Sequence, residues 1–103
     1  MAKLYVTEYP DLPGAYGTWA AQVVRDPPLV DQTPVVIGAG ALASAAFSSL
    51  TKIVRLHTDV VCSIAIGPSA TTVATANSQR MAANQTEYKF VIPGHIVSVI
   101  TNS

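Results

Sequence analysis

The C-terminal half of this chain carries almost no charge, and that feature constrains the fold more than any other. Between residues 60 and 103 only Arg80, Glu87 and Lys89 are ionised at neutral pH. The same stretch contains three apolar segments of strand length, VVCSIAIG, EYKFVIPG and HIVSVITN, bounded by glycine, proline or small polar residues. Because pleated segments with so little charge need other surfaces to cover them, we expect a β-sandwich that completes its burial in an assembly.

Side-chain alternation predicts which face of each strand is apolar. Residues 52–59, 60–67 and 87–92 alternate with the period of two that a half-buried strand requires. In these three segments, the residues expected to share an apolar face are Val54 and Leu56; Cys62, Ile64 and Ile66; and Tyr88, Phe90 and Ile92. With turn residues about every 8–12 positions, the sequence predicts an all-β fold, either an antiparallel β-sandwich or a jelly-roll-like barrel.

Two connections between these segments are also predicted. Thr58 and Asp59 favour a tight hairpin or a bulge between the strands at 52–59 and 60–67. Residues 68–85 are rich in small polar side chains and favour a long surface loop with a short strand at 80–82.

The N-terminal third has a different composition and predicts an extended arm. Five of the seven prolines lie before residue 35, and each one fixes its own φ and removes a backbone donor. We therefore expect residues 1–34 to form a proline-rich arm with short strands at 3–8 and 19–25. Residues 35–103 are expected to form the β-sandwich core. Residues 41–50 contain good helix formers but no strong cap, and the β-rich context favours a strand there, ending at Phe47 and Ser48.

The charge balance excludes several classes of partner. The 103 residues make one domain, with six basic and six acidic residues and a formal net charge of zero. Nucleic acid and anionic membranes attract basic patches, so we expect neither as a partner. No stretch approaches the roughly 20 apolar residues of a membrane helix, and no apolar signal core follows the first residues, so we expect synthesis in the cytoplasm. Charged residues make up only 12% of the chain, and a surface poor in charge tends to associate.

His57, Asp59 and Cys62 lie close together in the sequence and invite comparison with a Cys–His–Asp nucleophile system. A catalytic thiol needs a base within hydrogen-bond reach and a partly open setting, whereas Cys62 shares its strand face with two isoleucines. We therefore expect a buried, structural cysteine and no enzymatic activity. His57 and His95 show no metal-ligand spacing with Cys62 or with carboxylates, so we expect neither a metal site nor a cofactor.

Four aromatic residues near the N-terminus are the candidate interface residues: Tyr5, Tyr9, Tyr16 and Trp19. Tyrosine and tryptophan are favoured at interface hot spots, so we expect these side chains to anchor the arm in a neighbouring subunit. Packing within the domain core and stacking on a ligand such as a sugar stay open as alternatives. Stacking on nucleic-acid bases is disfavoured because basic partners are lacking.

A succession of short structural motifs runs through two long segments, VRLHTDVVCSIAIGPSATT and RMAANQTEYKFVIPGHIVSVI. An arginine strand is followed by a turn with aspartate and by C-x-I-x-x-G, and an E-Y-x-x-V-x-x-G segment precedes the last apolar strand. Together with the opening Ala-Lys-Leu-Tyr-Val-Thr-Glu, these motifs resemble small virion structural proteins of tailed bacteriophages. The resemblance covers most of the chain.

The resemblance implies a head decoration, or cement, protein. In that class, small β-rich domains sit as oligomers, often trimers, on the capsid lattice and extend arms across capsomer boundaries. We therefore expect a non-enzymatic protein on the capsid surface of the virion, made in the host cytoplasm, with the major capsid protein or other virion proteins as partners. A tail, adaptor or fibre-base ring subunit of the virion is the first alternative, and a carbohydrate-binding β-sandwich is the second.

Overall fold

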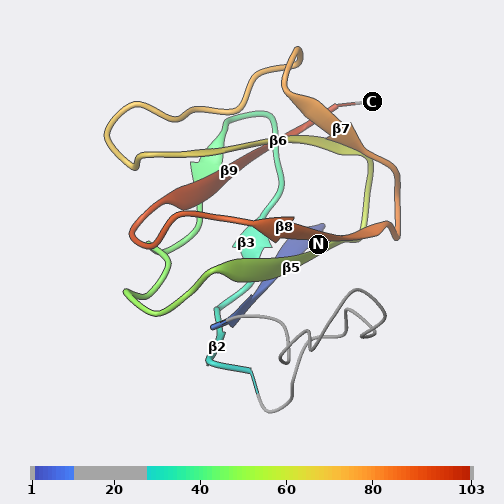
Figure 1. Ribbon diagram of the computed structural model, residues 1–103. Coiled ribbons are helices and arrows are strands. Elements are labelled where there is room, and N and C mark those ends of the chain that lie inside the picture. The colour runs from blue at the N-terminus through green and yellow to red at the C-terminus, as the bar shows by residue number, and fades with distance from the viewer. Residues whose placement is uncertain (1, 11–27, 103) are drawn as a thin grey trace, which may run out of the picture.

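The computed structural model describes residues 2–10 and 28–102, and these residues form nine strands and no helix (Figure 1). Most of the longer strands are built from the Val-, Ile- and Thr-rich segments, whose branched side chains fit a pleated surface. The strands are β1 Lys3–Tyr9, β2 Val30–Asp31, β3 Val35–Val36, β4 Leu42–Ala43, β5 Ile53–Thr58, β6 Cys62–Gly67, β7 Gln79–Met81, β8 Thr86–Phe90 and β9 Ile96–Thr101.

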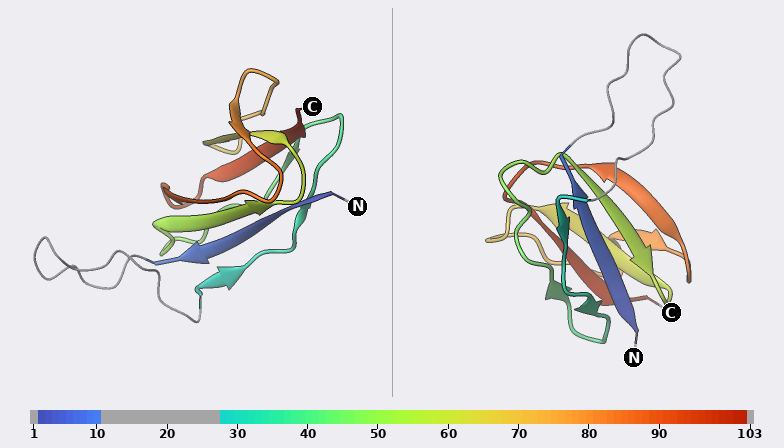
Figure 2. Two further views of the ribbon diagram at one scale, coloured as in Figure 1. Left: turned by 90° about the vertical axis from the view of Figure 1, so that its right-hand side faces the viewer. Right: turned by 90° about the horizontal axis from the view of Figure 1, so that it is seen from below.

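The strands form two sheets in which all paired strands are antiparallel. Sheet A has the order β2-β1-β5-β8, and β3 also pairs with β1. Sheet B has the order β4-β9-β6-β7. The two sheets lie as layers one above the other (Figure 2), so the predicted all-β antiparallel sandwich is confirmed.

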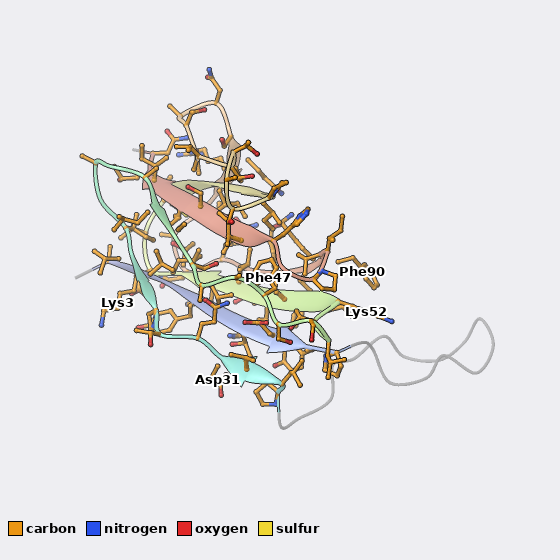
Figure 3. All side chains as sticks on the ribbon, turned by 90° about the vertical axis from the view of Figure 1, so that its left-hand side faces the viewer. Lys3, Asp31, Phe47, Lys52 and Phe90 are labelled. Atoms are coloured by element: carbon orange, nitrogen blue, oxygen red, sulfur yellow. The ribbon has the colours of Figure 1, made fainter. Side chains whose placement is uncertain are left out.

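The hydrophobic core lies between the two sheets. Alternation points every second residue inward, as predicted for Val54 and Leu56 of β5 and for Cys62 and Ile64 of β6. Phe47, from the connection between β4 and β5, fills the space between the layers (Figure 3). The buried core residues are Leu4, Val6, Val35, Ile37, Phe47, Val54, Leu56, Cys62, Ile64, Met81, Val97 and Val99.

β1 belongs to this core and not to an arm. It pairs with β5 from Leu4 to Tyr9 and also pairs with β2 and β3, and Leu4 and Val6 are buried. The strand predicted at residues 3–8 is therefore confirmed. The boundary predicted between residues 34 and 35 needs correction, because residues 3–9 and 30–31 are strands of the sandwich. The strand predicted at residues 19–25 lies outside the described residues.

The strand predicted over residues 41–50 is mostly wrong, since only the two residues of β4 form a ladder. The chain after β4 still runs beside β9. The Ser44 N–H donates to the carbonyl oxygen of Val97, and the Phe47 N–H to that of His95, both at 2.8 Å. Three residue steps, from Ser44 to Phe47, thus match two steps, from Val97 of β9 back to His95 just before it. The extra residue interrupts the regular ladder, as in a β-bulge.

The turn predicted at Thr58 and Asp59 exists, but it does not form a hairpin. It carries the chain from β5 in sheet A to β6 in sheet B, which do not pair with each other. The Thr58 hydroxyl donates to the carbonyl oxygen of Val60 at 2.6 Å and accepts from its N–H at 3.3 Å. This side-chain turn replaces the backbone pairing that a hairpin would supply.

The loop before β7 packs against the outer face of sheet B. The Ala74 N–H donates to Ser98 Oγ of β9 at 2.9 Å, and both residues are buried. Gly67 of β6 faces Thr72 so closely that a Cβ at position 67 would collide with the Thr72 hydroxyl. Sheet B therefore has part of its outer face shielded by its own chain. The short strand predicted at 80–82 is β7, one residue earlier.

A buried carboxylate, Glu8 of β1, joins the two layers on the side where β3 and β4 meet. Its Oε1 accepts from the Ser48 N–H at 2.8 Å and from the Thr51 hydroxyl at 2.5 Å, and its Oε2 accepts from Gln32 Nε2 at 2.7 Å. Gln32 in turn binds both backbone groups of Ala45. Because buried polar groups need partners, this network satisfies the carboxylate without a cation among the described residues.

We predict that Glu8→Ala lowers the free energy of unfolding by about 3 kcal/mol, because it leaves the buried Thr51 hydroxyl and the Ser48 N–H without their acceptor. Glu8→Gln is expected to cost less, since one oxygen remains, although its amide would face donors. Urea denaturation measures both effects. Asp31→Ala, at an exposed carboxylate in neighbouring β2, is the control and is expected to change little. A Glu8→Ala variant with wild-type stability would contradict the role of this network.

Candidate interaction surface

β8 directs its large apolar side chains away from the core. Tyr88 and Phe90 lie on the outer face of sheet A, with exposed fractions of 53% and 79%. Ile92, just after the strand, is 61% exposed. The prediction that these three residues share one face is confirmed by the alternating burial, but that face is turned to solvent.

The register of β8 against β5 is the reason for this inversion. Glu87 lies opposite Leu56 and Lys89 opposite Val54, and both of these β5 residues point into the core. Glu87 and Lys89 therefore face inward at the border of the sandwich, where their charged groups form an ion pair of 3.1 Å. Long charged side chains tolerate such a position because their stems cover apolar surface while their heads reach water. The same register turns Tyr88 outward.

The outer face of sheet A, which we call the exposed face, combines aromatic side chains of β1 and β8 with Arg55 and His57 of β5. Arg55 of β5 lies opposite Tyr88, and Ile53 lies opposite Phe90. Cross-strand neighbours of this kind contact one another on the pleated surface. The residues directed to this side are Tyr5, Thr7 and Tyr9 of β1, Ile53, Arg55 and His57 of β5, and Thr86, Tyr88 and Phe90 of β8, of which Tyr9 and Ile53 are buried. None of the loops described above for sheet B covers this face.

One end of the exposed face is polar. The ring of Tyr5 lies 6.2 Å from that of His57 between centroids, and His57 Nδ1 is 2.7 Å from the Thr86 hydroxyl oxygen. Arg55 and Asp59 line a shallow depression together with Tyr5 and His57. At the other end, Phe90 and Ile92 supply exposed apolar side chains. The Val91 N–H donates to the Lys52 carbonyl oxygen at 2.8 Å, and Phe90 lies beside Lys52 there (Figure 3).

The four predicted interface residues differ in their exposure to solvent, and two of them lie outside the described residues. Tyr5 is 39% exposed on the exposed face, where a partner can reach it. Tyr9 is on the same face but is only 4% exposed, so its burial leaves little surface for a partner. Tyr16 and Trp19 lie outside the described residues, and their contacts with a neighbouring subunit stay predictions.

The sequence neighbours His57, Asp59 and Cys62 do not converge on a reaction centre. Cys62 is buried between the sheets, where its thiol contacts the Thr58 hydroxyl at 3.5 Å. His57 points outward from sheet A. Burial raises the pKa of the Cys62 thiol, and the hydrogen bond with Thr58 opposes this only in part. The expected structural role of Cys62 is therefore consistent with its environment.

Within residues 2–10 and 28–102, no group of three or more His, Cys, Asp or Glu side chains is arranged to hold a metal ion. The described chain also contains no helix of the length and apolarity that crossing a membrane requires. No protein-family model, no curated protein and no solved structure matches this chain.

The alternation of residues 87–92 predicted that Tyr88, Phe90 and Ile92 share one face, but it did not predict that this face is exposed. The sequence does contain a pattern that indicates this exposure. Glu87 and Lys89 occupy the alternate positions of the same segment. Charged residues that point inward on an edge strand are a common feature of sheet edges, where they oppose pairing with other chains. Assigning that pair to the inner side of an edge strand would have turned the aromatic residues outward.

We predict that the Cys62 thiol reacts slowly with a bulky disulfide reagent in the native protein, because its burial blocks access and its raised pKa reduces the thiolate fraction. Reaction in denaturant should modify one thiol per chain. The control combines Cys62→Ala with Ser69→Cys in the exposed loop, and its native-state reaction is expected to be rapid. Equal native rates at the two positions would contradict the buried assignment.

Proposed function

We propose that this protein is a non-enzymatic structural protein of a phage virion that decorates and stabilises the head shell. The observation that carries the proposal is the exposed face of sheet A, with Tyr88 and Phe90 of the edge strand β8 open to solvent and Ile92 beside them. With 12% charged residues and a net charge of zero, the chain has little electrostatic repulsion to oppose the association of such a face with other surfaces. The resemblance to virion proteins of tailed bacteriophages supplies the class of partner.

The free energy available from three exposed apolar residues suits a weak contact that is repeated at many sites better than a single tight contact. Burying one exposed large apolar side chain contributes roughly 1.5–3 kcal/mol, and association opposes this with the loss of overall motion. Three such residues on one copy give a modest affinity. On a shell with many identical sites, and with protein bound only to the assembled state, even a modest affinity shifts the equilibrium toward the intact shell.

The proposed partner is the major capsid protein, or another virion protein, on the outer surface of the particle. The polar end of the exposed face, with Arg55, His57 and Tyr5, adds hydrogen-bonding groups that fix orientation. Tyr16 and Trp19 are proposed to add contacts from the segment between β1 and β2. A homo-oligomer is part of this proposal, and the resemblance alone implies a trimer.

A carbohydrate-binding role is the second candidate, and one observation favours it. The depression lined by Tyr5, Arg55, His57 and Asp59 combines an aromatic ring with polar groups, as sugar sites do. It is shallow and offers one exposed tyrosine, so we rank it below the shell contact. Binding of the free protein to a glycan array would favour it.

We predict that the double variant Phe90→Ser with Ile92→Ser binds undecorated head shells at least tenfold more weakly than the wild type, because it removes two exposed apolar side chains from the contact. Co-sedimentation measures the binding, and calorimetry of the shells measures the loss of thermal stabilisation. The matched control is Val73→Ser, also apolar and exposed but in the loop before β7, and it should bind normally. Equal binding by all three proteins contradicts the proposed contact.

We predict that replacing residues 11–27 by a short glycine-containing turn leaves the sandwich folded and weakens shell binding. The Leu29 N–H donates to the Glu8 carbonyl oxygen at 2.8 Å, so the two ends of the segment are adjacent and a hairpin turn can join them. Circular dichroism checks the fold, and co-sedimentation checks the binding. A folded variant with undiminished binding would remove Tyr16 and Trp19 from the proposed interface.

Antibody labelling of intact virions in the electron microscope distinguishes a position on the head shell from one at the neck or tail. Label over the head shell supports decoration. Label at the neck or tail supports the alternative of a tail, adaptor or fibre-base subunit. Particles without label contradict a virion role altogether.

A further inference from the structure

β8 forms the free edge of sheet A. It pairs with β5 on one side, and among the described residues no strand pairs with its other side (Figure 2). The Thr58 N–H donates to the Gln85 carbonyl oxygen, and the Val91 N–H to that of Lys52. In an antiparallel ladder the bonded residues alternate, so Glu87 and Lys89 also direct their backbone groups toward β5. The backbone groups of Thr86, Tyr88 and Phe90 therefore point toward the open edge.

We propose that β8 pairs with β8 of a second copy of this chain, antiparallel and about a two-fold axis at Tyr88. Sheets A of the two copies then form one continuous sheet. Self-pairing about a two-fold axis is isologous, so every contact occurs twice. Thr86 meets Phe90 of the second copy, and Tyr88 meets Tyr88, all with backbone groups already directed at the shared edge.

The charges select this register. With the axis at Tyr88, Glu87 lies opposite Lys89 of the second copy and Lys89 lies opposite its Glu87. These are non-hydrogen-bonded positions, at which antiparallel side chains approach most closely. An axis at Glu87 would place Glu87 against itself, and an axis at Lys89 would do the same with Lys89. Only the axis at Tyr88 pairs opposite charges twice while keeping the strand paired along its length.

In one copy, Glu87 and Lys89 form an ion pair along the same strand, at 3.1 Å. Such a pair of inward charges also serves to block edge-to-edge association in many sheets. The two roles make different demands on the charges. Charges that block edge association need only be present, whereas charges that select the dimer must have opposite signs at positions 87 and 89 of each copy. That difference makes the proposal testable.

Pairing through β8 leaves the outer side chains free. Tyr88 and Phe90 of both copies would lie side by side on one face of the continuous sheet, which doubles the apolar area available to a partner. This inference stands on the edge geometry and the charge order and does not rest on the proposed function. It gives a dimer, in contrast to the trimer that the family resemblance implies.

Sedimentation equilibrium of the full chain over a range of concentrations tests the pairing. The wild type is expected to form dimers. Glu87→Lys and Lys89→Glu are each expected to weaken the dimer at least tenfold, since each places two pairs of like charges opposite one another. The double variant Glu87→Lys with Lys89→Glu keeps opposite signs across the axis and is expected to restore dimers.

A backbone variant tests the edge itself. The Tyr88 N–H points away from β5, so Tyr88→Pro removes no bond within one copy but removes the central bonds of the dimer. Circular dichroism and thermal unfolding are expected to show a folded protein, and sedimentation a monomer. Tyr88→Ala, which removes the ring and keeps the N–H, is the control and is expected to dimerise.

Three results would overturn the proposal. One is a wild-type monomer at the highest soluble concentration. Another is a dimer that the single charge variants leave intact or that the double variant fails to restore. The third is a folded Tyr88→Pro variant that still dimerises. Single and double charge variants that all remain monomeric like the wild type would assign Glu87 and Lys89 to edge protection alone.

Discussion

The hydrogen-bond network of Glu8 determines how the sandwich closes. One carboxylate on β1 accepts from the Thr51 hydroxyl, the Ser48 N–H and the Gln32 amide, and so fixes the connection between β4 and β5 against sheet A. That connection carries Phe47 into the core. The side of the sandwich near β3 and β4 is thus closed by polar contacts between the layers. On the side near β7 and β8, the charged groups of Glu87 and Lys89 border the core instead.

This asymmetry explains where the exposed apolar residues of sheet A lie. Part of the outer face of sheet B is shielded by the chain's own loop, through contacts such as Ala74 with Ser98. The outer face of sheet A keeps Tyr88 and Phe90 open to solvent, and the free edge of β8 borders the same face. An apolar face, and an edge with which no strand of residues 2–10 and 28–102 pairs, lie on one side of a small domain that is poor in charge, and both favour association there. A structural role in an assembly is consistent with that arrangement.

The sequence predicted the all-β fold and most strand positions because alternation is a local property. Val54 with Leu56, and Cys62 with Ile64, pointed inward as expected. The misassigned parts depend on contacts distant in sequence. The prolines of residues 1–34 suggested an arm, but Leu4 and Val6 complete a core whose other members lie beyond residue 34. The interface predicted from the sequence consisted of Tyr5, Tyr9, Tyr16 and Trp19, and Tyr5 is indeed exposed. The exposure of Phe90 was missed because it depends on how β8 registers against β5, which alternation alone does not determine.

Hydroxyl-radical footprinting of the protein in intact virions and free in solution tests the central claim most directly, because it reports the solvent exposure of individual side chains. If the exposed face of sheet A contacts the shell, oxidation of Tyr88 and Phe90 should fall sharply in the particle, while oxidation of Val73 in the loop before β7 should stay unchanged. Equal oxidation of Tyr88 and Phe90 in the two states, or protection at Val73 alone, would contradict the account.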